Sequence, residues 1–135
     1  SLKLVHDIAS RNYKVNISEI EKNKWTKLAN KHSEYNWTKS NADYVIIYPQ
    51  EPKDLIKEGN SLSHCVASYV RNVLHETTNI VFLREKETPD ESLYTIEIAR
   101  NSIVQARGRF NERISGKAAE FLKEFAKEFD LKLAY

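Results

Sequence analysis

The sequence has little of what builds the commonest metal-based and cofactor sites. Its only cysteine is Cys65, so no disulfide can form within the chain and a zinc site would need other residue types. Three glycines leave no glycine-rich phosphate loop. Apolar runs stay far below the roughly 20 residues that span a bilayer, and no stretch resembles a signal peptide. We therefore expect a cytoplasmic protein without metal, cofactor or membrane contact.

Methionine is absent as well, and the sequence begins at Ser1. Hydrophobic residues make up 41% and charged residues 30% of the 135 residues, a balance typical of a soluble globular domain. This length suffices for one hydrophobic core. We expect a single domain over residues 1–135 that is a fragment of a longer protein, with a helical lead-in over residues 1–40 and a core over residues 44–135.

Charge is nearly balanced over the whole chain, at a formal +2, but it is unevenly distributed. Residues 1–40 hold eight Lys and Arg against four Asp and Glu, and residues 100–113 hold four Arg against Glu112. Such patches suit nucleic acid or an acidic partner, although solvated surfaces have the same composition.

Hydrophobic periodicity predicts an α+β fold. Helices are expected up to about residue 11, from a capping box at Ser18-x-x-Glu21, over 52–58, over 61–75 and after Ser115; strands are expected over 44–48, 79–84, 92–99 and 102–110, with a tight turn at Arg100-Asn101. The expected architecture is an antiparallel β-meander with an additional strand, packed by N-terminal, central and C-terminal helices.

The stretch 59–75 resembles a helix stop followed by a helix start. Gly59 suits the end of one helix and Ser61 the N-cap of the next. The expected helix has an apolar stripe that includes Cys65, which favours packing over a nucleophilic role for this thiol. Its polar side carries four residues at helical spacing: His64, Ser68, Arg71 and His75. The two histidines would lie about 16 Å apart, too far for one metal ion.

A second group of polar residues follows the tight turn. Gln105-x-Arg107-Gly108-x-x-Asn111 places two amides, a guanidinium and a permissive backbone within seven residues. A two-residue turn would set Ile96 opposite Gln105 and Tyr94 opposite Arg107, which places Thr95 and Glu97 on the other side of the hairpin. Which side faces the core stays open at this point.

Together the two groups resemble the PcfJ-like family. The resemblance rests on the segment Glu58 to Tyr69, with its His64-Cys65-Val66 centre, and on Arg84, Thr95-Ile96-Glu97 and Gln105 to Asn111 in this order. His6-Asp7 extends it toward the start of the chain. The resemblance implies an accessory protein of a plasmid or other mobile element, associated with conjugative DNA transfer.

Two functions remain open. The first is a binding module that contacts DNA, or a relaxase or coupling protein of a transfer system, through its basic segments. The second is an enzyme for a phosphate-bearing or nucleotide substrate, with His64 in proton transfer. The candidate binding residues are Ser68, Arg71, Gln105, Arg107, Arg109 and Asn111. A structural network around His64 is the alternative to catalysis.

Overall fold

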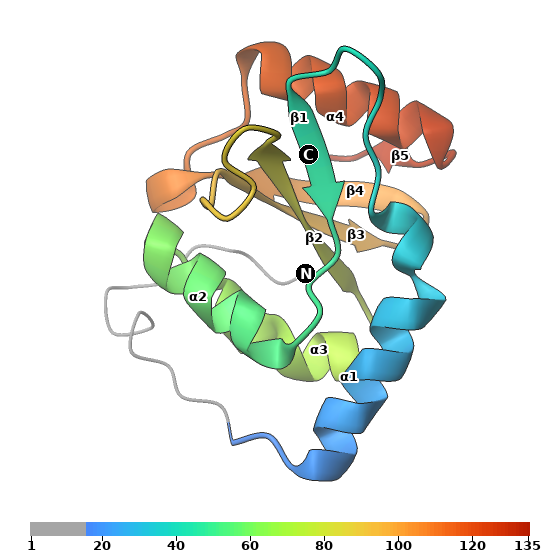
Figure 1. The fold of residues 1–135 in the computed structure, drawn as a ribbon, viewed down its shortest axis with the longest axis vertical. Coiled ribbons are helices and arrows are strands. Elements are labelled where there is room, and N and C mark those ends of the chain that lie inside the picture. Colours follow the sequence, from blue (N-terminus) through green and yellow to red (C-terminus); the bar gives the residue numbers. More distant parts are fainter. Residues whose placement is uncertain (1–15) are drawn as a thin grey trace.

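The computed structural model describes residues 16–135 (Figure 1). Its helical elements are α1 (Glu19–Lys31), η2 (Ser33–Tyr35), α2 (Pro52–Leu62), η3 (Val66–Tyr69), α3 (Val70–Leu74), η4 (Arg109–Asn111) and α4 (Gly116–Glu128). Its strands are β1 (Tyr44–Ile47), β2 (Asn79–Glu85), β3 (Tyr94–Ala99), β4 (Ser102–Arg107) and β5 (Lys132–Leu133). The expected helix near residue 11 and the pair His6-Asp7 lie outside the described residues.

One five-stranded sheet organises the chain in the order β1-β2-β3-β4-β5. Neighbours from β1 to β4 are antiparallel, and β5 adds a short parallel pair beside β4. The tight turn at Arg100-Asn101 is confirmed, because both residues have positive φ, at 51° and 60°, as a two-residue hairpin of type I′ requires. The predicted α+β meander with an additional strand is therefore confirmed.

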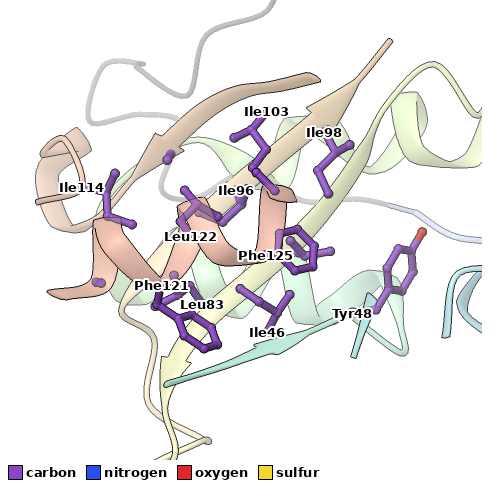
Figure 2. Close-up of a cluster of buried hydrophobic side chains, with 14 of the residues drawn as sticks. Ile46, Tyr48, Leu83, Ile96, Ile98, Ile103, Ile114, Phe121, Leu122 and Phe125 are labelled. Atoms are coloured by element: carbon purple, nitrogen blue, oxygen red, sulfur yellow. The ribbon is translucent and has the colours of Figure 1, made fainter. Parts of the chain in front are cut away.

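Helix α4 covers one face of the sheet (Figure 1). Its apolar side chains Phe121, Leu122 and Phe125 lie against isoleucines and leucine of the strands, as Figure 2 shows. Ser115 occupies the N-cap position of α4 as predicted, although its side chain makes no capping hydrogen bond. This face forms an ordinary apolar core.

The other face carries α1, α3 and η3, and α2 packs against η3 (Figure 1). Trp25 of α1, Tyr69 of η3 and Phe82 of β2 are almost completely buried in a second apolar cluster. Helix α1 begins as predicted, with Ser18 and Glu21 closing a capping box. The sheet is thus enclosed between two helical layers.

The predicted boundary at Gly59 and the helix over 61–75 were wrong. Helix α2 continues through Gly59 to Leu62 and ends at Ser63, which adopts the left-handed conformation at φ 55°. The chain then forms the 3-10 turn η3 and only five α-helical residues in α3. Gly59 is required for close packing instead, because a Cβ atom there would lie 2.9 Å from the carbonyl oxygen of His64.

Candidate functional site

A one-residue bulge places the polar side chains of the β3–β4 hairpin. Ile98 lies opposite Ile103, but Glu97 lies opposite Gln105, so Val104 is an extra residue on β4. Because side chains alternate along a strand, one extra residue moves every later side chain to the other face. The bulge therefore decides which residues of β4 face α4 and which face α2.

The predicted register beyond the bulge was wrong for this reason. Arg107 lies opposite Thr95 rather than Tyr94, and Ile96 lies opposite Ala106. The polar residues of both strands therefore share the face covered by α2 and η3, and the isoleucines share the face covered by α4. The expectation that Thr95 and Glu97 lie on the other side of the hairpin from Gln105 and Arg107 was wrong as well.

A continuous chain of hydrogen bonds crosses this polar face. The Arg84 guanidinium donates to Glu58 Oε1 at 2.9 Å, and Thr95 Oγ1 donates to Glu58 Oε2 at 2.8 Å. His64 Nε2 lies 2.9 Å from the same Thr95 oxygen. Since the only hydroxyl proton of Thr95 is used on Glu58, His64 must donate from Nε2. We call Glu58, His64, Arg84 and Thr95 the buried network.

The fold uses both ring nitrogens of His64. Its Nδ1 accepts a 3.4 Å hydrogen bond from the backbone N–H of Val66, which completes the neutral tautomer. Burial lowers the pKa of His64 to about 4, so the ring is uncharged at neutral pH. His64 therefore lies in the link between α2 and η3 and ties that link to β3.

Glu58 is completely buried on α2. Burial raises the pKa of its carboxyl group, and hydrogen bonds from Ser92, Arg84 and Thr95 act in the opposite direction. Arg84 also donates to the carbonyl oxygen of Pro89 and lies 4.6 Å over the ring of Phe82. The ion pair of Glu58 and Arg84 therefore joins helix, sheet and the β2–β3 loop.

A second set of hydrogen bonds lies further along β3 and β4. Glu97 accepts from Thr78 at 2.8 Å and from the Gln105 amide at 3.1 Å. The same amide lies 3.2 Å from the Tyr69 hydroxyl group on η3. Gln105 is thus brought near the buried network, but its amide is engaged with the fold.

The predicted polar line on the helix 61–75 does not exist, because that helix is interrupted. Ser68 donates its hydroxyl proton to the carbonyl oxygen of Cys65 at 2.8 Å. Arg71 forms an ion pair with Glu21 of α1. The Cys65 side chain is buried, and burial raises the pKa of its thiol, which disfavours the reactive thiolate.

A groove of about 610 Å³ opens beside the buried network, between α2, the end of β1 and the β2–β3 loop. Arg84 and Ser92 are among its lining residues, whereas His64 and Thr95 are not. A small molecule in this groove would therefore contact Arg84 and Ser92 rather than the imidazole. Within residues 16–135, no group of three or more His, Cys, Asp or Glu side chains could hold a metal ion.

The arginine loop, residues 107–113, begins at the last residue of β4 and contains the other predicted binding residues. Arg109 and Arg113 are exposed, Arg107 is half-buried, and the Arg107 guanidinium donates to the carbonyl oxygen of Asn111 at 3.4 Å. The side-chain oxygen of Asn111 is buried without a hydrogen-bond partner. Phe110 is 71% exposed.

The loop differs from the rest of the described chain in its ion pairing. No ion pair within residues 16–135 involves Arg107, Arg109 or Arg113. Arg100 lies in the turn at the other end of β4, six strand residues away, or about 20 Å at the usual rise per residue. The basic segment 100–113 is therefore not one patch, and the loop stands apart from the turn.

Fold and site together define an α+β domain whose buried polar network joins the end of a helix to a bulged hairpin. The sequence pattern of the family described as PcfJ-like protein matches residues 1–122, and the chain belongs to this family. An uncharacterized protein of Listeria innocua serovar 6a is 33% identical over 111 residues, which cover 81% of this chain. They cover 21% of the relative, so the chain spans about a fifth of that protein's length. No solved structure matches the chain.

Sequence reasoning missed two central residues. Glu58 stood in the family segment, but it had no assigned role because helix α2 was expected to end there. Phe110 was not among the candidate binding residues, although its position directly after Arg109 indicates a basic, aromatic loop. None of the helices over residues 16–135 combines the length and the apolar character that crossing a membrane demands.

Proposed function

We propose that this chain is a DNA-binding accessory module of a conjugative transfer system, and that the arginine loop contacts the phosphate backbone. The observation that carries the proposal is the set of three arginines, Arg107, Arg109 and Arg113, without a carboxylate partner among the described residues. Guanidinium groups bind phosphate oxygens through paired hydrogen bonds. The family resemblance supports the transfer context.

The distribution of charge supports the same surface. The loop holds three arginines and Glu112, which accounts for the whole formal net charge of +2. The rest of the chain has equal numbers of basic and acidic side chains. A polyanion approaching this protein is therefore attracted to the loop more than to the average surface.

The geometry of His64 favours this binding role over the enzyme alternative. A general base needs a nitrogen that can reach the substrate proton. Both ring nitrogens of His64 are engaged in the fold, the ring is 3% exposed, and the neighbouring groove is lined by other residues. In this proposal His64 stabilises the α2–η3 link and contacts no ligand.

A salt titration tests the proposal. Binding of a fluorescent single-stranded oligonucleotide is measured by anisotropy across a series of salt concentrations, with folding checked by circular dichroism. Each phosphate contact contributes about 0.7 to the slope of log K against log salt for single strands, so the double variant Arg109→Ala/Arg113→Ala is expected to lose about 1.4 of the slope. The variant should also bind more weakly at every salt concentration.

Arg100→Asn is the matched control, because it removes one arginine from the turn at the far end of β4 and Asn suits positive φ there. We expect it to leave most of the slope unchanged. Absence of binding by folded wild type at low salt would overturn the proposal and direct attention to a relaxase or coupling protein. An equal loss in the control and the double variant would also contradict it.

A further inference from the structure

Phe110 is a large apolar side chain that the fold leaves exposed among the residues of the arginine loop. Its ring is 71% exposed, and its backbone has φ 52° and ψ 34°, a left-handed conformation uncommon outside glycine. Asn111 follows with φ 62°. Two successive residues in this conformation turn the chain back on itself, so that Arg113 pairs with Arg107, and Phe110 is left exposed in the turn.

Local hydrogen bonds hold the loop in this shape. The Gly108 N–H donates to the carbonyl oxygen of Glu112 at 2.7 Å, and the Asn111 N–H donates to that of Gly108 at 3.1 Å. Gly108 also packs on Tyr94, since a Cβ atom there would lie 2.9 Å from the Tyr94 ring. The loop is therefore anchored at its base and presents Phe110 in a fixed position, which reduces the entropy lost when a ligand binds.

The arginines beside Phe110 indicate which class of ligand suits the loop. Arg109 and Arg113 are exposed on either side of Phe110 in the sequence, and neither is engaged in an ion pair with another described residue. A hydrophobic protein partner alone would leave these charges unmatched. Single-stranded nucleic acid offers a flat base for the ring and phosphates for the guanidinium groups in one repeating unit. A duplex offers phosphates but keeps its base faces stacked inside.

We propose that Phe110 is a stacking platform for a base of single-stranded DNA, with Arg109 and Arg113 on the adjacent phosphates. The inference rests on the proposed function and narrows it, since phosphate contacts alone would not distinguish single strands from duplexes. It assigns the loop a preference for exposed bases. The preference requires no particular base, because every base has a face that can stack.

The experiment compares three probes of equal length: oligothymidylate, the same strand with abasic sites in place of its bases, and a duplex. Wild type is expected to bind oligothymidylate about tenfold or more tightly than the abasic strand, since stacking is worth that much per base. Phe110→Ala should bind the two strands equally, whereas Phe110→Tyr should keep the preference. Ile20→Ala, which removes an 82% exposed apolar side chain from α1, is the matched control and should change nothing.

A direct readout uses Phe110→Trp. Its added fluorescence should be quenched by oligothymidylate and not by the abasic strand, while wild-type fluorescence, from Trp25 and Trp37, changes less. Equal binding of all three probes by wild type, together with unchanged binding by Phe110→Ala, would overturn the inference and leave the phosphate contacts intact. Failure of wild type to bind any probe would overturn the proposed function, and the inference with it.

Discussion

The buried network and the arginine loop use similar residues in opposite ways. Arg84 is 14% exposed at its side chain and donates to a carboxylate and a carbonyl group, whereas Arg109 is exposed and has no such carboxylate among residues 16–135. A buried guanidinium without acceptors would cost several kcal/mol, so the fold must supply them. An exposed guanidinium is solvated by water and remains available to a ligand. Burial therefore separates residues that maintain the fold from residues that can meet a partner.

The family segment from Gln105 to Asn111 contains both residues that maintain the fold and residues that can meet a partner. Gln105 and Arg107 are both half-buried on one face of β4, but the Gln105 amide is held by Tyr69 of η3 and Glu97 of β3, whereas Arg107 donates to the carbonyl oxygen of Asn111 in the arginine loop. The two side chains therefore differ in what they contact, although they lie two residues apart on one strand. A shared sequence segment is therefore weak evidence for a shared role.

The largest expected difference between the buried network and the arginine loop is in what their arginines contribute to the free energy of unfolding. Arg84→Met leaves the Glu58 carboxylate buried without its cation, and we expect a loss of about 3–5 kcal/mol in the free energy of unfolding. Urea denaturation followed by circular dichroism measures it. The double variant Arg84→Met/Glu58→Leu removes both charges and should recover most of the loss. A double variant as unstable as the single one would show that the network stabilises through packing rather than through charge pairing.

A smaller effect on stability is expected from the protonation of His64 at low pH. His64 has a pKa of about 4 in the folded chain and about 6.5 when unfolded, so the unfolded state binds more protons between these values. The stabilisation by neutral His64 is complete above about pH 6.5 and is lost as pH falls toward 4, which amounts to about 3 kcal/mol.

The test measures unfolding at pH 7 and at pH 4.5 for wild type and His64→Asn. Wild type should lose more stability than the variant over this interval. Glu58 contributes with the opposite sign, because its raised pKa gives stability that is present at low pH and lost as pH rises. This contribution is common to both proteins and largely cancels in the comparison. Equal pH dependence of the two proteins would contradict a buried neutral imidazole.

The smallest effect on stability is expected in the loop. Arg109→Met, the exposed counterpart of Arg84→Met, should change the free energy of unfolding by less than about 0.5 kcal/mol, since the side chain forms no ion pair with any of residues 16–135. The same urea titration measures it. A loss above 1 kcal/mol would mean that Arg109 belongs to the fold rather than to a binding surface.

Much of the fold could be predicted because local patterns determine it. The apolar run Ile80 to Leu83 predicted β2, the alternation from Tyr94 to Ile98 predicted β3, the residues at Arg100-Asn101 predicted the hairpin turn, and Ser18 predicted the start of α1. Strand β5 was missed because its two residues are held by pairing with β4 and not by a pattern of their own. Local sequence patterns therefore predict most of the helices and strands, but not a strand that forms only by pairing with another.

The candidate site was harder to predict, because its geometry depends on two irregularities. The helical spacing of apolar residues runs from Leu62 to Val73 without a break, although the backbone at Ser63 is left-handed and ends α2. Periodicity alone therefore predicts one helix where the structure has the short elements η3 and α3. Val104 has no special residue type that marks a bulge. The direction in which each side chain of the site points therefore required the three-dimensional structure.

The extra residue at Val104 has a consequence for comparing related sequences. The number of residues in β4 between the turn and the arginine loop decides on which face of the sheet each later side chain lies. Adding or removing one residue moves these side chains to the opposite face, whereas adding or removing two leaves them on the same face. A relative lacking one residue between Ile103 and Gln105 would carry the same amide and guanidinium on the side of α4, against isoleucine. The distance of this pair from the turn, counted in residues, is therefore as much a part of the family segment as the residues themselves.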